Sequence, residues 1–259
     1  MALWDRFRVL SLQDFEKAYA RLKIPFDEFS GESKAVADIL DVLSRLREKK
    51  LTMRSDGAEL VDLTSFQLPK VMVRKRDATS LYMTRDLAEA FRRQAKYGRI
   101  DLMLYVAGTE QSIHFKQLFR ILRLLAFDAK CDLQHVAFGA VRGMSTRHGT
   151  SVFLSDIIDQ CRDNVLEIMT EKNKSFGSDQ DAATEGERRR IAERLGLSAL
   201  FVQDMKARRH KDYDFDWSRC LDTDGDTGIL IQYTHARLCG SLLFSFIFAP
   251  TGIHSIYPC

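Results

Sequence analysis

Proline and paired cysteine are scarce in this sequence of 259 residues. Only four prolines occur, and Pro69 is the only one between Pro25 and Pro250, so long helices can run through the middle of the chain. The five cysteines are Cys131, Cys161, Cys220, Cys239 and Cys259. They form no Cys-x-x-Cys pair and have no histidine at finger spacing, which argues against a zinc site and fits a reducing compartment.

A strong charge of one sign and a long apolar run are also missing. The chain has 39 Lys and Arg against 36 Asp and Glu, a net charge of +3, which excludes a histone-like polycation but leaves a local basic patch for RNA open. Within the uncharged stretch 240–259, the apolar run 242–249 is too short to cross a bilayer. We expect no targeting segment in the chain, because Asp5, Asp14 and Glu16 interrupt its first residues.

The first 73 residues mix helical and strand-like patterns. Ser11 precedes an apolar-periodic run, which predicts a helix over 11–23, and a second helix is predicted over 34–50. Residues 26–33, punctuated by Gly31, are expected to form a loop or a short strand. Short strands are expected over 59–63, 66–68 and 71–73.

Residues 80–141 have the pattern of a parallel α/β sheet. Residues 80–83 are expected to end a strand, and Thr84 to cap a helix that closes at Tyr97-Gly98. The apolar run 101–107 is typical of a strand buried on both faces. A second apolar run covers 135–141, and a helix is predicted between the two runs over 112–127. Ligands of such sheets bind past the carboxyl ends of the strands. Polar stretches follow those predicted ends at 82–86, 108–114 and 142–149, which predicts a single crevice.

The rest of the chain is predicted to be helical. Helices are expected from Thr150 to about Lys172, over 188–209 and around 231–239. The polar stretch 173–187 is expected to be an insertion or linker, because it has too few apolar residues to pack.

The loop Arg142-Gly-Met-Ser-Thr-Arg-His-Gly149 has the composition of a phosphate site. Its glycines let the backbone approach a ligand, its hydroxyls donate hydrogen bonds, and its two arginines neutralise charge. It is not a Walker loop, because the glycine spacing and the lysine are both wrong. A solvated basic loop explains the same residues, so the loop alone leaves both interpretations open.

Five segments, in order along the chain, resemble the class I arginyl-tRNA synthetases. Gly143-Met-Ser-Thr-Arg147 looks like the form that the Lys-Met-Ser-Lys-Ser loop takes in that family. The other segments are 80–87, 105–117, 134–141 and 225–238. Each alone is a weak signal, whereas the ordered set is specific and covers most of residues 1–238. Residues 4–8, 26–27 and 31–33 are similar to the mitochondrial and fungal branch.

The resemblance implies an arginine pocket lined by Tyr82, Asp86 and Gln111. A substrate guanidinium needs a carboxylate partner, and Asp86 is the best candidate. Without the resemblance, Asp86 is an acid favoured in a first helical turn, Tyr82 a core aromatic and Gln111 a loop residue.

The resemblance also implies a site for ATP, which is expected as a substrate together with Mg²⁺; no other metal or tightly bound cofactor is expected. The residues implied to contact ATP are His114, Val136 and Phe138. The residues implied to hold the triphosphate, and to stabilise the charge on departing pyrophosphate, are Met144, Ser145, Thr146 and Arg147. Without the resemblance, helix capping is the favoured role of His114, and a core role explains Val136 and Phe138 as well as contact with adenine does.

Basic and aromatic residues interleave near the C-terminus, which fits contact with RNA. The basic residues are Arg188 to Arg190 and Lys206 to Lys211, and the aromatic ones are Tyr213, Phe215 and Trp217. A solvated helix face beside a packed core is the alternative. In the resembling family this zone leads to the anticodon-binding bundle and meets the tRNA.

The chain departs from the family at both ends. The His-Ile-Gly-His-type tetrapeptide of class I enzymes does not occur, and the similarity stops near Cys239. We therefore expect a middle fragment, either an isoform or an incomplete gene model, that is inactive alone. The expected division is a partial Rossmann-like catalytic domain with inserted elements over 1–150, a helical connecting region over 151–239 and a divergent tail over 240–259.

The function implied by the resemblance is arginine–tRNA ligation. ATP would activate L-arginine, and the arginyl group would pass to tRNA(Arg), with no membrane partner and with a monomeric full-length protein. The alternative is a non-catalytic RNA- or partner-binding product of the same family. The branch resemblance favours the mitochondrial matrix over the cytoplasm.

Overall fold

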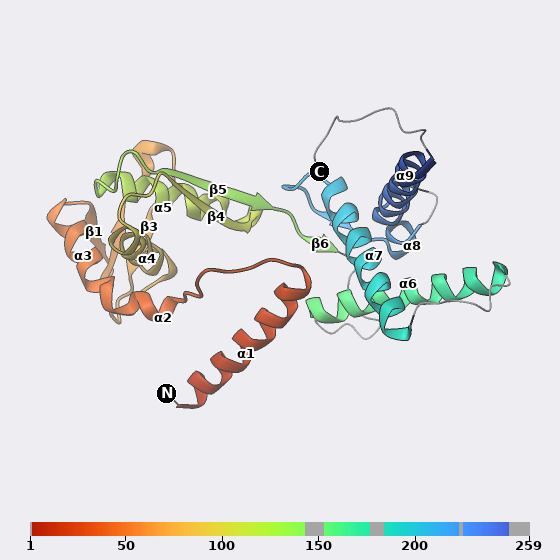
Figure 1. The fold of residues 1–259 in the computed structure, drawn as a ribbon. Helices are drawn as coiled ribbons and strands as arrows, with labels where there is room; N and C mark the ends of the chain where they lie inside the picture. The colour runs from red at the N-terminus through yellow and green to blue at the C-terminus, as the bar shows by residue number, and fades with distance from the viewer. Residues whose placement is uncertain (1, 143–152, 177–183, 223–224, 249–259) are drawn as a thin grey trace. The chain divides into compact units, whose positions relative to one another are not determined.

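The computed structural model describes residues 2–142, 153–176, 184–222 and 225–248, and its backbone forms two compact units (Figure 1). The sheet unit consists of Phe26–Ala140 and Arg209–Lys211. The helical unit consists of Met1–Pro25, Val141–Arg208 and Asp212–Cys259. The division into a catalytic domain, a helical connecting region and a tail, with boundaries at residues 150 and 239, stays a prediction.

A parallel strand pair and its crossover helix form the part of the sheet unit that the sequence predicts best. Strand β4 (Leu102–Gly108) pairs with β5 (Asp132–Phe138) in unbroken register, from Leu102 opposite Asp132 to Gly108 opposite Phe138. Between them lie the 3₁₀ turn η3 (Thr109–Gln111) and helix α5 (Ser112–Leu124). Parallel strands require such a crossover. The predicted strand–helix–strand order and α/β class are confirmed.

Only one face of β4 is covered within the described part of the chain. Met103 is buried, whereas Leu102, Leu104 and Val106 are exposed, so the expected burial of both faces is wrong for this strand. Side chains alternate across a strand, and α5 covers the Met103 side with Phe115 and other apolar residues of the core. An uninterrupted apolar run therefore does not by itself show two covered faces.

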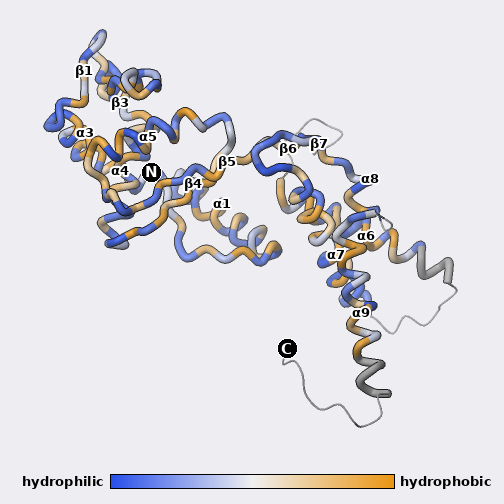
Figure 2. Tube along the Cα trace, turned by 90° about the horizontal axis from the view of Figure 1, so that it is seen from above, coloured by the Kyte–Doolittle hydropathy of each residue, from blue (hydrophilic) through white to orange (hydrophobic). Residues whose placement is uncertain are grey.

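Helix α4 (Tyr82–Tyr97) shares that core with α5. Hydrophobic and hydrophilic residues alternate along these helices (Figure 2), and the buried positions recur every three or four residues, as in Leu118, Ile121 and Leu122 of α5. The helix predicted over 34–50 is confirmed as three consecutive pieces, which contribute Val42 and Leu46 to the core. They are α2 (Glu32–Ala35), the 3₁₀ helix η1 (Val36–Asp38) and α3 (Ile39–Glu48).

An antiparallel sheet completes the unit, with strand order β1 (Thr52–Ser55), β2 (Ala58–Val61) and β3 (Val71–Arg74). Strand β1 was not predicted, because Arg54 and Ser55 break its apolar pattern. The strand expected over 66–68 is wrong: a 3₁₀ turn, η2 (Thr64–Phe66), stands there, and Asp62 accepts hydrogen bonds from the Thr64 amide and hydroxyl. This local side-chain bonding favours a turn over a strand.

The entry into α4 also differs from the prediction. Tyr82 is the first helical residue and Leu81 the N-cap, so residues 81–83 do not end a strand and Thr84 does not cap the helix. Thr84 is fully buried, and its hydroxyl donates to the Val73 carbonyl of β3. The predicted end is confirmed at Gly98, whose φ of 71° suits a residue without a Cβ.

The helical unit contains most of the remaining helices. They are α1 (Ala2–Arg21), α6 (Leu154–Phe176), α7 (Glu185–Lys206), α8 (Trp217–Cys220) and α9 (Gly228–Phe248). Two short strands, β6 (Val141–Arg142) and β7 (Tyr213–Asp214), pair in parallel. The predicted helices exist, but α1 begins well before Ser11 and α9 continues past Cys239. No helix of the described ranges is long and apolar enough to cross a membrane.

Helices α6 and α7 pack closely because Gly196 has no side chain. A Cβ on Gly196 would lie 2.9 Å from the backbone carbon of Cys161. Arg21 of α1 adds an ion pair to each helix, with Nη2 2.9 Å from Asp159 Oδ1 and Nε 2.8 Å from Glu193 Oε1. The capping box formed by Thr184 and Glu187 fixes the start of α7.

Candidate active site

The candidate site centres on a contact between α4 and α5. Asp86, in the second turn of α4, and His114, in the first turn of α5, lie with Oδ2 and Nε2 only 2.7 Å apart. Their side chains are 40% and 26% exposed, so the pair is open to a ligand while partly shielded from water. Two of the three predicted polar stretches therefore meet, although 82–86 opens a helix rather than following a strand of the parallel sheet.

Aromatic rings support this contact from the core side. The His114 ring stands edge-on to the Phe115 ring at 5.4 Å, and Phe115 stacks on His135 at 4.5 Å. Tyr105 packs against Phe115, and burial raises the pKa of its phenol to about 12. Tyr105 therefore stays protonated and neutral at physiological pH, and it is a packing residue that the sequence analysis did not single out.

Tyr82 lies one turn before Asp86 on α4, and its side chain points away from the core. It is 69% exposed, so the core-aromatic interpretation is wrong. The Arg85 guanidinium lies 5.9 Å from its ring, and Arg85 in turn pairs with Glu32 of α2. The exposed ring and the Asp86 carboxylate thus belong to consecutive turns of one helix.

The residues expected to contact ATP follow or end the two parallel strands. Because Gly108 pairs with Phe138, the polar turn ending in Gln111 and the end of β5 belong to the same edge of the strand pair. Gln111 is exposed, Phe138 is 44% exposed and Val136 is half-buried. A core role is therefore excluded for Phe138. His114 does not cap its own helix, since the N-cap of α5 is Gln111 and has no side-chain cap bond.

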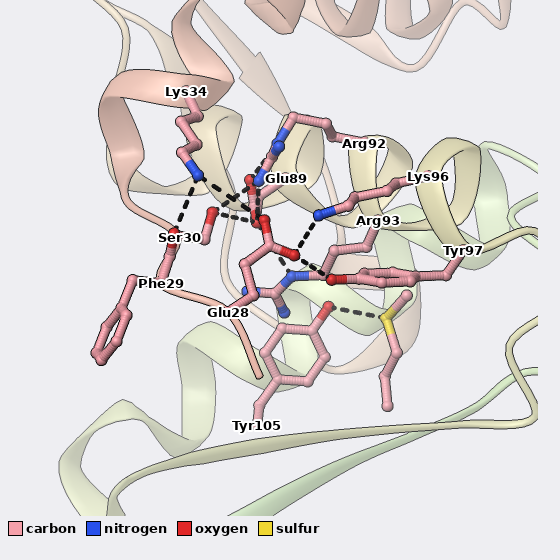
Figure 3. Close-up of polar contacts among 11 residues, drawn as sticks. Glu28, Phe29, Ser30, Lys34, Glu89, Arg92, Arg93, Lys96, Tyr97 and Tyr105 are labelled. Atoms are coloured by element: carbon pink, nitrogen blue, oxygen red, sulfur yellow. Dashed lines mark hydrogen bonds and ion pairs between the residues drawn. The ribbon is translucent and has the colours of Figure 1, made fainter. Parts of the chain in front are cut away.

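Two polar residues before α2, Glu28 and Ser30, and the first residue of α2, Glu32, contact α4, a feature that sequence reasoning missed. Figure 3 shows the contacts of Glu28 and Ser30. Glu28 accepts hydrogen bonds from Lys96 and the Tyr97 hydroxyl. Ser30 lies within 3.1 Å of Glu89, and Glu32 pairs with Arg85. We call Glu28, Ser30, Glu32 and their α4 partners the polar ladder. No single periodicity in the sequence marks it, because Glu28 and Ser30 precede α2 whereas Glu32 is its first helical residue.

Charge pairing within the polar ladder stabilises the ionised form of Glu28 and Glu89. Hydrogen bonds from Lys96 and Tyr97 lower the pKa of Glu28 to about 2. Burial raises the pKa of Glu89, but Arg92 and Arg93 outweigh it, so the net shift is downward. Arg92 binds Glu89 through Nε at 2.8 Å, and Arg93 through Nε at 3.1 Å. Both arginines are therefore engaged by the Glu89 carboxylate.

The predicted catalytic loop, Met144, Ser145, Thr146 and Arg147, lies outside the described residues. The predicted RNA-facing aromatics, by contrast, are packed. Phe215 is buried and meets Trp217 edge-on at 4.9 Å, while the Tyr213 hydroxyl donates to Asp204 Oδ1 at 2.8 Å. Phe215 thus belongs to the smaller core, and half-buried Tyr213 and Trp217 pack against it, as the packed-core alternative expects; contact of this zone with RNA stays a prediction. In the part of the chain that the structure describes, no group of three or more His, Cys, Asp or Glu side chains could hold a metal.

Comparison with known proteins gives one consistent family. Residues 1–217 match the family described as "tRNA synthetases class I (R), catalytic domain". The chain is 42% identical over 240 residues to a probable cytoplasmic arginine–tRNA ligase of Dictyostelium discoideum, covering 92% of this chain and 40% of the relative. It is 43% identical to the mitochondrial arginine–tRNA ligase of Saccharomyces cerevisiae, covering 91% of this chain and 36% of the relative.

A solved structure agrees with this match. The arginyl-tRNA synthetase of Plasmodium falciparum superposes with a TM-score of 0.78 at 25% identity, over 97% of this chain and 41% of that one. The chain thus spans about 40% of the length of the first relatives that it matches.

Proposed function

The chain belongs to the class I tRNA synthetases of the arginine type, and on that premise we propose that it acts in the ATP-dependent ligation of L-arginine to tRNA(Arg). In the first step a carboxylate oxygen of arginine attacks the α-phosphorus of ATP, and pyrophosphate leaves. In the second, a hydroxyl of the terminal ribose of tRNA attacks the arginyl carbonyl carbon, and AMP leaves. The proposal draws its main structural support from the accessible Asp86 carboxylate beside the exposed Tyr82 ring.

The proposed arginine pocket uses Asp86, Tyr82 and Gln111. The Asp86 carboxylate would accept hydrogen bonds from the substrate guanidinium, a pairing that is stronger than one between neutral groups. The Tyr82 ring, already near the Arg85 guanidinium, offers an aromatic face for a second cation. Gln111 would add an amide acceptor from the edge of the strand pair.

The proposed ATP site uses His114, Val136 and Phe138, with Met144, Ser145, Thr146 and Arg147 at the triphosphate. Arg147 would stabilise the negative charge that grows on pyrophosphate as it leaves. Since the described residues offer no cluster of metal ligands, we propose that Mg²⁺ enters on the phosphates of ATP.

Compartment and oligomeric state stay predictions. The cytoplasmic and mitochondrial relatives are 42% and 43% identical to this chain, so overall similarity does not separate the two locations. The mitochondrial matrix remains our prediction, and organelle fractionation of the native protein is its test. The predicted monomer is tested by sedimentation of the full-length protein.

The test of the function is titration of the chain with L-arginine in the presence of ATP. Asp86→Asn removes the charge that pairs with the guanidinium, so arginine affinity should fall by about 30-fold or more, since losing one member of a shielded charge pair costs about 2–5 kcal/mol. Asp41→Asn, at an exposed carboxylate of α3, is the matched control and should bind normally.

Citrulline separates recognition of the guanidinium from general binding, because it has the same shape without the charge. Wild type should prefer arginine to citrulline, and Asp86→Asn should lose that preference. Equal binding of both ligands by wild type would refute the arginine pocket. If the chain bound tRNA(Arg) but no arginine, the non-catalytic RNA-binding alternative would replace the proposal.

A further inference from the structure

We infer that His114 is a positioning residue for arginine recognition: its Nε2–H donates a hydrogen bond to Asp86 Oδ2 and thereby orients the carboxylate that receives the substrate guanidinium. This rests on the proposed function, because it assumes that Asp86 binds arginine. It gives the imidazole a role that does not depend on contact with ATP.

The contact has the geometry of a strong hydrogen bond. The two atoms are 2.7 Å apart, which is typical of a bond to an ionised acceptor. The partners come from different helices and are 28 positions apart in sequence, so the packing of α4 against α5 brings them together. The contact therefore forms only in the folded sheet unit.

The imidazole is restrained from behind. Its edge-on neighbour Phe115 is only 7% exposed and stacks on His135 at 4.5 Å. The Nε2 atom of His135 lies 3.1 Å from the Ala107 carbonyl oxygen, which fixes that ring on β5. The rings behind His114 are thus held in place, and His114 can fix the plane of the carboxylate in turn.

The bond to His114 leaves acceptor capacity on Asp86. A carboxylate offers about four acceptor positions, and His114 takes one of them. Among the described residues Asp86 has no other hydrogen-bond partner, and the neighbouring Arg93 is engaged by Glu89 at 3.1 Å. An oriented carboxylate with open positions needs less ordering when a guanidinium arrives, which favours binding.

The proton must be on Nε2 for this bond. The neutral Nε2–H form leaves the full negative charge of Asp86 for the guanidinium, whereas an imidazolium would repel it. We therefore assign the neutral Nε2–H tautomer to the arginine-binding form. The Nδ1 atom takes no part in this bond, so it stays available for the proposed contact with ATP.

The experiment combines two substitutions with two measurements on the whole chain. His114→Phe keeps a planar ring without a donor, and His114→Gln supplies an amide N–H at a similar reach. We expect His114→Phe to weaken arginine binding about tenfold, the loss of one hydrogen bond to a charged group, and His114→Gln to restore it to within about threefold of wild type. His210→Phe, at an exposed histidine without a contact to Asp86, is the matched control.

The second measurement is the ¹⁵N–¹H correlation of the histidine rings, with His114→Gln identifying the signal of His114. We expect a proton on Nε2, and a proton on Nδ1 alone would overturn the inference. A second result would also overturn the inference: His114→Phe binds arginine as tightly as wild type, whereas Asp86→Asn loses arginine binding. Thermal melts verify that each variant is folded. If neither wild type nor Asp86→Asn bound arginine, the proposed function itself would fail, and the inference with it.

Discussion

Glu59 holds the antiparallel sheet to α3, and its substitution gives a sharp test of the fold that carries the site. Its side chain is 7% exposed and accepts hydrogen bonds from Arg47 Nη2 at 2.6 Å, Arg47 Nε at 3.0 Å and Arg74 Nη1 at 3.2 Å. Glu59→Gln keeps the shape but removes the charge. It also turns one acceptor into an N–H group that faces guanidinium donors.

The expected loss of stability is about 2 kcal/mol. A hydrogen bond to a charged group contributes about 1.5–3 kcal/mol, and an amide donor left without an acceptor adds to the loss. The Arg47 and Arg74 side chains are 44% and 36% exposed, so water partly replaces what they lose. For a unit of this size 2 kcal/mol corresponds to a fall of about 8 °C in melting temperature.

The dependence of stability on pH tests whether the charge of Glu59 causes the stabilisation. Hydrogen bonds from Arg47 lower the pKa of Glu59 in the folded chain, although burial opposes the shift. A lowered folded pKa means that the stabilisation is complete above the ordinary glutamate pKa and is lost as pH falls through the lowered value. The difference in free energy of unfolding between wild type and Glu59→Gln should therefore be complete at pH 7 and should become smaller below pH ~4.

Thermal melts at pH 7 and pH 3, with amide hydrogen exchange of β2, measure both quantities. Glu48→Gln, at an exposed carboxylate of α3, is the control and should melt like wild type. A change of less than about 0.5 kcal/mol at pH 7, the scale of ordinary surface substitutions, would refute the role assigned to Glu59. If the difference in stability between wild type and Glu59→Gln stayed constant from pH 7 to 3, the charge of Glu59 would not be the cause of the stabilisation.

Two further substitutions test how α4 is held. Thr84→Val should destabilise the chain by about 1–3 kcal/mol, because the buried Val73 carbonyl loses its donor, whereas Thr84→Ser should cost less; denaturant midpoints decide, and equal losses would contradict the hydrogen bond. Glu28→Gln should lower the melting temperature at pH 7 and make it depend less on pH. The reason is that the pKa of Glu28 is lowered to about 2, so the stabilisation by its carboxylate is lost between pH 4.5 and 2. Melting temperatures of variant and wild type that change in parallel with pH would exclude this role.

The sequence predicted the parallel strands and their crossover helix because those elements are specified locally. Apolar runs mark β4 and β5, and the periodic pattern over 112–124 marks α5. The antiparallel sheet was harder, since β1 has the residues Thr-Met-Arg-Ser and its partner strand decides its conformation. Strand propensity depends on such pairing more than helix propensity does.

The errors around Thr84 have a different physical cause. A threonine before a helical pattern satisfies the rule for an N-cap, yet here its hydroxyl bonds to β3, outside the helix. The carbonyl of Val73 is available for that bond because the register between β2 and β3 shifts at Glu59 and Leu60, an irregularity no local pattern reveals. Tertiary context thus overrides the capping rule.

The contact between Asp86 and His114 in the candidate site also depends on tertiary structure that the sequence alone did not predict. Family resemblance selected Asp86 and His114 separately, one for arginine and one for ATP, and neither spacing nor composition placed them together. Their contact follows from the packing of α4 against α5, while Thr84 and the polar ladder fix where α4 begins and how it lies. A substitution in the ladder, such as at Glu32, should therefore affect the exposed Tyr82 ring through Arg85 without touching a ligand. On the proposed function, the position of the Asp86 carboxylate would therefore depend on how α4 is placed as well as on the residues that face the substrate.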